Sequence, residues 1–284
     1  MTKGCEPSYS SRMMTKRSFV VLALLATACH RGATSSPAPT AGTLKVLVYN
    51  VHAGKDAKGV DNLQRVADVV KASGADVVLL QEVDKGTRRS GKVDQPSEYA
   101  KRTGFHAAFG RSLDYDGGEY GIAILSRWPM RGDTAIHLPV EPPQERSGGS
   151  HEPRVAMRAI VASPYGELLF LNTHIDASGD ERWRLQEIQT IIPLAKTRST
   201  AFVGGDFNST PESAVQQQLR ASGLRDSWTT CGTGNGLSYP ADVPVKRIDY
   251  LFLTGAAECT HAEVLVNEAS DHRPVLFTVR FGTR

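Results

Sequence analysis

The sequence has few cysteines, and this excludes a disulfide scaffold or a zinc-built domain. Its 284 residues contain four cysteines, of which Cys5 and Cys29 lie near the N-terminus. The spacing of the other two, Cys231 and Cys259, fits no zinc site. In an oxidising compartment two such cysteines can pair, so we expect a disulfide between them if the protein is exported.

The sequence also lacks the basic surplus of a protein that binds long nucleic acid. The formal net charge is +3, but residues 1–42 hold five of the 33 basic residues and one of the 30 acidic residues. The remaining chain therefore carries a slight net negative charge, whereas proteins that grip many phosphates usually have an excess of Lys and Arg. Nucleic acid is not the favoured partner, although a local basic patch could still bind it.

No apolar run near the N-terminus is long enough to span a bilayer. The run Phe19–Ala26 follows three basic residues and is too short to cross about 30 Å of hydrocarbon, which is typical of a signal peptide. Residues 25–29 resemble a bacterial lipobox that ends at Cys29. We expect residues 1–29 to be a signal peptide of the lipoprotein type, with membrane association through a lipidated Cys29 and a place in the cell envelope. The alternative is a plain signal peptide that is cleaved without lipidation, which would make the protein secreted.

No second linker and no internal repeat interrupts the chain after its first segment. Residues 30–42 are rich in Pro, Ser, Thr, Ala and Gly, which predicts a flexible tether. Strand and helix patterns alternate from Leu44 to the end, so we expect residues 43–284 to form one domain and the protein to be a monomer. Early βα units followed by strand pairs predict an α/β (α+β) fold, a four-layer α/β/β/α sandwich of two packed mixed β-sheets flanked by helices.

The apolar periodicity places the main elements. A pattern resembling a capping box at 61–64 opens a helix that Gly74 ends, and a second amphipathic helix is expected over 181–196. Strands are expected at 44–49, 76–81, 120–126, 155–163, 167–173, 200–204, 248–254, 260–266 and 275–281.

Isolated polar residues stand where these apolar strands end or begin. Each one alone is as well explained by a turn or by a structural hydrogen bond. Together they are four carboxylates, two asparagines and two histidines that should meet at one edge of the sheets. The eight residues are Asn50, Glu82, His174, Asp206, Asn208, Asp249, Asp271 and His272.

This set predicts a hard divalent cation. Carboxylates gathered without a cation repel one another, which raises their pKa values. Mg²⁺ binds carboxylate, amide and water oxygens, and Mn²⁺ could substitute for it. The absence of thiolates from the set makes zinc the less suitable metal.

These residues lie in six blocks of the sequence, which are Val48–His52, Leu80–Val83, Asn172–His174, Gly205–Asn208, Arg247–Tyr250 and Ser270–Pro274. In this order, the blocks resemble the signature blocks of the endonuclease/exonuclease/phosphatase superfamily. The resemblance covers residues 44–281. The segments Arg88–Gly91 and Gly118–Arg127 are similar to those of a bacterial branch of the superfamily, and this chain would be an exported member of that branch.

The resemblance implies the metal ligands. Glu82 would be the principal Mg²⁺ ligand, with Asn50 and Asp271 beside it in the metal or water shell. Some nucleases of the superfamily carry an acidic residue two positions after the first asparagine, where this chain has His52. The chain therefore has one anionic ligand fewer than those members, which weakens the case for a second metal.

The resemblance also implies the catalytic residues. His272, oriented by Asp249, would polarise or deprotonate the attacking water, and Asp206 would help to place that water; either could be the base. Asn208 would donate to a phosphate oxygen. His174 would bind the phosphate and is a candidate for protonating the leaving oxygen.

Arg154 is a candidate clamp for the substrate phosphate, because a guanidinium can bind two oxygens at once. A surface arginine at the start of a strand is the alternative interpretation of Arg154.

The implied reaction is hydrolysis of a phosphate ester by activated water, and three functions fit it. The first is a Mg²⁺-dependent phosphodiesterase or phosphatase for a small molecule or a lipid headgroup, which the near-neutral body and the expected tether favour. The second is an extracellular deoxyribonuclease-like endonuclease that uses the basic segment Lys85–Lys92. The third is an inactive surface-binding lipoprotein that kept the fold.

Overall fold

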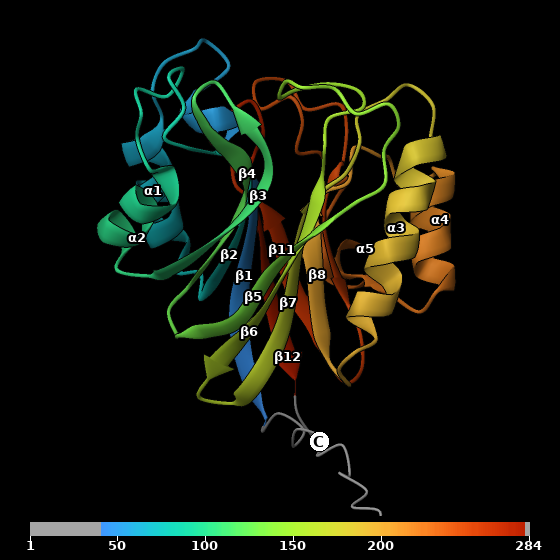
Figure 1. Cartoon of the computed structure of the whole chain (residues 1–284). Coiled ribbons are helices and arrows are strands. Elements are labelled where there is room, and N and C mark those ends of the chain that lie inside the picture. The colour runs from blue at the N-terminus through green and yellow to red at the C-terminus, as the bar shows by residue number, and fades with distance from the viewer. Residues whose placement is uncertain (1–40, 282–284) are drawn as a thin grey trace, which may run out of the picture. The chain divides into compact units, whose positions relative to one another are not determined.

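Two six-stranded mixed β-sheets lie face to face in the computed structural model, which describes residues 41–281 (Figure 1). The first sheet contains β1 (Gly42–Asn50), β2 (Val77–Lys85), β3 (His106–Tyr115), β4 (Gly118–Ser126), β11 (Glu258–Val264) and β12 (Val275–Phe281). The second contains β5 (Met130–His137), β6 (Val155–Ser163), β7 (Gly166–His174), β8 (Ala201–Asp206), β9 (Arg225–Asp226) and β10 (Asp249–Leu253). Their orders are β11-β12-β1-β2-β4-β3 and β5-β6-β7-β8-β10-β9.

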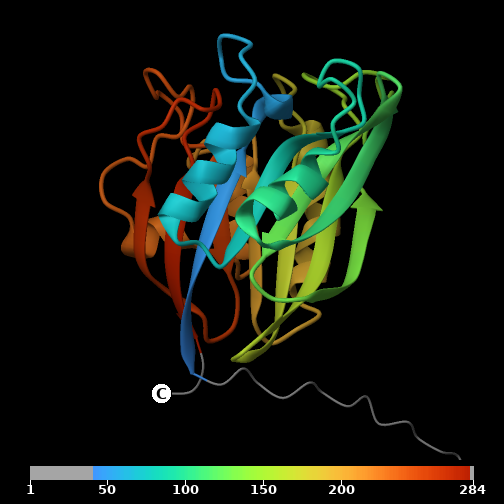
Figure 2. The same cartoon turned by 90° about the vertical axis from the view of Figure 1, so that its left-hand side faces the viewer.

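Helices cover the outer face of each sheet. Figure 2 shows α1 (Leu63–Ser73) and α2 (Gln95–Thr103) side by side on the first sheet. The helices α3 (Arg182–Ala195) and α4 (Ala214–Ala221) cover the second sheet, and α5 (Ser227–Cys231) is a short turn of helix beside β11. The predicted α/β/β/α sandwich of two packed mixed sheets is confirmed.

Three apolar clusters hold these four layers together. The cluster between the sheets includes Phe170 and Phe202, whose stacked rings are 4.6 Å apart. A second cluster joins the first sheet to α1 and α2 through residues such as Tyr99, and a third joins the second sheet to α3 and α4 through residues such as Ile188. Every strand that carries the site is thus buried on both faces, which gives the site a rigid base.

The strand register brings the predicted site residues to one edge. Each sheet has one central parallel pair, β1 with β2 and β7 with β8. In these pairs Asn50 lies opposite Gln81, and His174 lies opposite Asp206. The antiparallel strand β10 begins with Asp249 opposite Asp206. Parallel strands end at a common edge, so the carboxyl ends of β1, β2, β7 and β8 meet there.

The structure adds elements that the periodicity did not predict. The apolar pattern predicts no element in the stretches that form β3, β5, α2 and α4. β5 is an edge strand that is mostly exposed, and such a strand lacks an apolar alternation. Aspartate is a favoured N-cap residue, and Asp94 before α2 accepts a hydrogen bond from the backbone N–H of Ser97 at 3.0 Å.

The expected capping box at the start of α1 is not formed. The helix begins at Leu63, and its N-cap residue Asn62 makes no side-chain capping bond. The Asn62 amide instead donates to the carbonyls of Val51, Lys55 and Ala269. Asn62 therefore fastens the loop after β1 to the loop before β12, next to the site.

The expected disulfide is present. Cys231 at the end of α5 is bonded to Cys259 of β11, with the two Cα atoms 5.7 Å apart. The predicted signal peptide, lipidation of Cys29 and most of the predicted tether fall outside the described residues. Among residues 41–281, no helix combines the length and the apolar character that crossing a membrane requires.

Candidate active site

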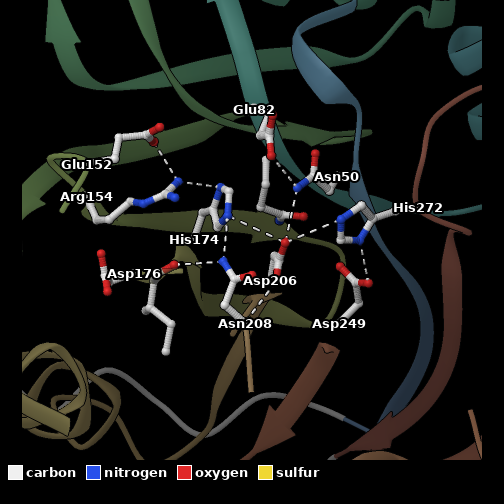
Figure 3. A network of polar contacts seen from close by, with 12 residues as sticks. Asn50, Glu82, Glu152, Arg154, His174, Asp176, Asp206, Asn208, Asp249 and His272 are labelled. Carbon is white, nitrogen blue, oxygen red and sulfur yellow. Dashed lines mark hydrogen bonds and ion pairs between the residues drawn. The ribbon is translucent and has the colours of Figure 1, made fainter. Parts of the chain in front are cut away.

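Seven of the nine predicted site residues line one cavity of about 290 Å³ at the shared strand edge, and Figure 3 shows the polar contacts among most of them. The other two, Asn50 and Asp249, are hydrogen-bonded to residues of this group. A larger cavity of about 600 Å³ lies beside Trp228 and β11, but no predicted site residue lines it. The seven are Glu82, Arg154, His174, Asp206, Asn208, Asp271 and His272.

Asn50 connects the two sheets at the site. Its side-chain amide donates to Glu82 Oε1 at 3.0 Å and to Asp206 Oδ2 at 3.1 Å. Its carbonyl oxygen accepts from the backbone N–H of His52 at 3.0 Å. All three polar positions of Asn50 are thus used, and Asn50 orients two carboxylates from different sheets.

Local backbone irregularities aim the side chains at the cavity. The β2–β4 register shifts between Leu80 and Val83, and Glu82 within this bulge has φ of 56°. A bulge next to a site commonly re-aims a side chain. Gly205, before Asp206, has φ of 144°, and a Cβ there would lie 1.8 Å from Thr173 O. Only glycine permits this close approach of β8 to β7.

Asp249 fixes the position of the His272 ring. Asp249 Oδ2 lies 2.9 Å from His272 Nδ1 and also accepts a hydrogen bond from Ser238 Oγ at 2.6 Å. The other ring nitrogen, Nε2, lies 3.6 Å from Asp206 Oδ2. All three residues are almost fully buried, so the imidazole stands between two carboxylates and shielded from bulk water.

The charges of these buried groups shift their proton affinities. Burial by itself lowers the pKa of His272, but Asp249, Asp206 and Asp271 together raise it to about 10. Burial and the neighbouring Asp249 raise the pKa of Asp206 to about 7, against the opposing effect of His272. The two groups therefore titrate as an interacting pair.

His174 lies on the other side of Asp206 and is held by Arg154 and Asn208. Arg154 Nη1 donates to His174 Nδ1 at 2.7 Å, and Asn208 Nδ2 lies 3.0 Å from His174 Nε2. Burial and the adjacent guanidinium lower the pKa of His174 well below its usual value. Arg154 is thus not a surface arginine: its side chain is 2% exposed and paired with Glu152 at 2.6 Å.

Two groups of residues could hold a cation. Asp206, Asp249 and His272 offer ligand atoms within 4.8 Å of one another, but a hydrogen bond already joins Asp249 to His272. Glu82 and Asp271 line the cavity, and among residues 41–281 neither forms an ion pair with a lysine or an arginine. Carboxylate oxygens of this kind suit a hard divalent cation such as Mg²⁺.

Sequence reasoning missed several residues around the site. The Tyr239 ring lies 4.7 Å from the His272 ring, and Lys246 also lines the cavity. Beneath the cavity, Gln81 Nε2 donates to Asn172 Oδ1 at 2.7 Å and ties the sheets together. Gln81 and Asn172 belong to the sequence blocks Leu80–Val83 and Asn172–His174, so a role as buried polar partners could have been predicted for them. Tyr239 and Lys246 lie in an irregular loop whose sequence has no recognisable motif.

The basic segment Lys85–Lys92 is largely neutralised by carboxylates. Lys85 lies 3.2 Å from Glu119, and Arg88 lies 2.9 Å from Asp116. Arg89 is paired with the fully buried Asp84 at 2.7 Å. Three of its four basic side chains thus have protein partners, which leaves little free charge for a polyanion.

The chain is similar to known proteins over most of its length. It is 24% identical over 247 residues to the uncharacterized protein YbhP of Escherichia coli K12, covering 82% of this chain and 94% of that protein. An endonuclease/exonuclease/phosphatase structure from Beutenbergia cavernae superposes with a TM-score of 0.69 at 23% identity over 84% of this chain and 72% of that one. The mannosyl-6-phosphatase Bt3783 of Bacteroides thetaiotaomicron gives 0.67 at 19% identity over 83% and 99%.

The family assignment does not depend on these distant likenesses. The sequence profile described as the Endonuclease/Exonuclease/phosphatase family matches residues 47–272, which include all nine predicted site residues. Members of such a family act on phosphate esters and typically use divalent metals, and the fold and the carboxylate–histidine site agree with this. The chain belongs to the endonuclease/exonuclease/phosphatase family.

Proposed function

We propose that the protein is a divalent-metal-dependent hydrolase that cleaves phosphate esters of a small molecule or a lipid headgroup by activated water. One observation carries the proposal: buried Asp249, His272 and Asp206 form a continuous row beside the carboxylates Glu82 and Asp271, which have no lysine or arginine partner among residues 41–281. Such a row offers both proton transfer and cation binding at one place.

Glu82 and Asp271 would hold Mg²⁺, or Mn²⁺ in its place, with Asn50 orienting Glu82. When bound, the cation would neutralise charge on the phosphate oxygens as a Lewis acid.

The protein's own residues supply the rest of the mechanism. The Asp206–His272 pair takes the proton of the attacking water as one unit, and Asp249 keeps the imidazole in place. Arg154, His174 and Asn208 form the opposite wall of the cavity, where their donors can hold the phosphate oxygens. A phosphate held between the two groups would face the water in a fixed direction, which lowers the entropic part of the barrier.

The size and charge of the site favour a small phosphate ester over a nucleic acid. A cavity of about 290 Å³ is at the small end of ligand sites. Among the described residues, Lys246 is the only lysine that lines the cavity, and the basic segment Lys85–Lys92 is mostly paired with carboxylates. A deoxyribonuclease-like endonuclease is therefore the weaker alternative, and an inactive binding protein is weaker still because the row of reacting groups is complete.

One screen tests the proposal. Full-length protein is incubated with aryl phosphodiesters, sugar phosphates, phospholipid vesicles or supercoiled plasmid, with Mg²⁺ or with EDTA. We expect Mg²⁺-dependent release of phosphate or headgroup from one of the small substrates or vesicles, and none with His272→Ala. Plasmid nicking alone would favour the endonuclease, and no turnover on any substrate would favour the binding protein.

We also propose that the protein is exported and lipidated at Cys29, as the leader pattern predicts. Metabolic labelling with a fatty acid tests this. Label should enter the wild-type protein and be lost in Cys29→Ser; an unlabelled, secreted wild-type protein would contradict the proposal.

A further inference from the structure

A buried ion pair lies behind His174, on the side away from His272 (Figure 3). Glu152 Oε1 lies 2.6 Å from Arg154 Nη1, and the two side chains are 0% and 2% exposed. The second carboxylate oxygen of Glu152 accepts from the backbone N–H of Gly148. Because the Arg154 Nη1 atom also reaches His174 Nδ1 at 2.7 Å, Glu152, Arg154 and His174 form a continuous chain that ends at the cavity.

The contacts of His174 determine which ring nitrogen carries its hydrogen. A guanidinium has only donors and stays charged, so His174 Nδ1 must accept from Arg154. A neutral imidazole has one acceptor nitrogen, and its hydrogen therefore lies on Nε2. Asp206 Oδ2, 3.5 Å away, is an acceptor for that hydrogen, and the Asn208 amide directs its own donor to the carbonyl of Ile175 at 3.0 Å.

A second proton on His174 has no place to bind. It would have to lie between Nδ1 and the guanidinium nitrogen that already donates to it. Burial and the positive charge of Arg154 accordingly lower the pKa of His174. The ring can donate a hydrogen bond from Nε2, but as a singly protonated imidazole it has no surplus proton to give away.

We propose that the Glu152–Arg154 pair fixes His174 as the tautomer with its hydrogen on Nε2, so that His174 donates a hydrogen bond to a phosphate oxygen and does not protonate the leaving group. Glu152 does not line the cavity and acts through Arg154, so it is a positioning residue. The role toward phosphate rests on the proposed function, whereas the tautomer does not. Of the two roles expected for His174 from the sequence, phosphate binding is therefore kept and protonation of the leaving oxygen is not.

Two-bond ¹H–¹⁵N spectra of the full-length protein labelled with ¹⁵N-histidine test the tautomer directly. The His174 signals are identified by their loss in His174→Asn. We expect an unprotonated Nδ1 and a protonated Nε2 at neutral pH. A hydrogen on Nδ1, or on both nitrogens, would overturn the inference.

Variants test the role of Glu152. Glu152→Gln keeps the shape but removes the counter-ion, so the buried guanidinium should leave its place and the His174 signals should average between the two tautomers. The matched control is Asp226→Asn, which breaks another buried pair, with Arg247 at 2.9 Å, and should leave His174 unchanged. A single unchanged tautomer in folded Glu152→Gln would refute the positioning role.

The wild-type spectrum alone decides the tautomer, so the inference stays testable if Glu152→Gln does not fold. The spectra need no substrate. A protein with the expected tautomer but no hydrolase activity would therefore overturn the proposed function and leave this inference standing.

Discussion

His272 Nδ1 lies 2.9 Å from an oxygen of Asp249 that also accepts a hydrogen bond from Ser238. These two contacts fix both the carboxylate and the ring, and they leave Nε2 facing Asp206. An imidazole held in this way can exchange a proton with water without first reorienting, which is the requirement for efficient acid–base catalysis.

Loss of this contact should slow turnover. We expect His272→Ala and Asp249→Asn each to lower kcat by on the order of 10²-fold or more, because positioned acid–base groups contribute about that much. Steady-state kinetics on an aryl phosphodiester, with circular dichroism to verify folding, measures the effect. Wild-type turnover in both variants would show that the dyad takes no part in the reaction.

Replacement of the expected metal ligand should change metal dependence more than folding. Glu82→Gln keeps the hydrogen bond from Asn50 but removes one negative charge from the cavity. We expect a Mg²⁺ requirement raised by about 10-fold or more, since ligand charge sets the affinity of such sites. Glu98→Gln on α2 is the control and should titrate like the wild type. The same Mg²⁺ curve for Glu82→Gln would remove Glu82 from the metal site.

Much of the site could be predicted from the sequence because its residues occupy strand ends. Asn50, His174 and Asp206 each end a buried strand, and the parallel pairs bring these ends together. The β7 and β10 patterns were strong because both strands are buried on both faces. Strand ends in layered sheets thus carry positional information that survives without a structure.

Other features could not be predicted from the sequence. Glu82 reaches the cavity only through a bulge and a positive φ, and neither has a signature in Leu80–Val83. The local sequence beside Pro153 is typical of a surface glutamate at position 152. Glu152 is nevertheless fully buried, where it is the counter-ion of the buried Arg154. Long-range partners of buried charges depend on packing that local periodicity does not encode.

The pH dependence of stability should report the buried Glu187. Burial raises its pKa to about 8 from an ordinary value of 4.5. The folded state therefore holds a proton that the unfolded state releases, so this stabilisation is complete below about pH 4.5 and is lost as the pH rises to about 8. Glu187→Gln cannot ionise and escapes this loss.

Urea unfolding at pH 5 and pH 9 tests this expectation. The free energy of unfolding of Glu187→Gln, relative to the wild type, should increase by roughly 1–3 kcal/mol between the two pH values. Glu212→Gln, at an exposed site before α4, should show no such change. An equal pH dependence in Glu187→Gln and the wild type would mean that Glu187 is ionised without cost.

Substitutions of His174 should separate hydrogen-bond donation from proton transfer. A glutamine amide can present an N–H near the place of Nε2–H, but it cannot transfer a proton. We expect His174→Gln to keep kcat within about 10-fold of the wild type and His174→Ala to lose on the order of 10²-fold, the usual cost of one removed donor. Equal losses in both variants would indicate a proton-transfer role.

The location of the bound cation is the most direct test of the account. Crystals grown with Mn²⁺ and measured at its absorption edge give an anomalous peak at the metal. We predict a peak coordinated by Glu82 and Asp271, with Asp249 still hydrogen-bonded to His272. A peak among Asp206, Asp249 and His272, which could also hold a metal, would contradict the division between cation-binding and proton-transferring residues.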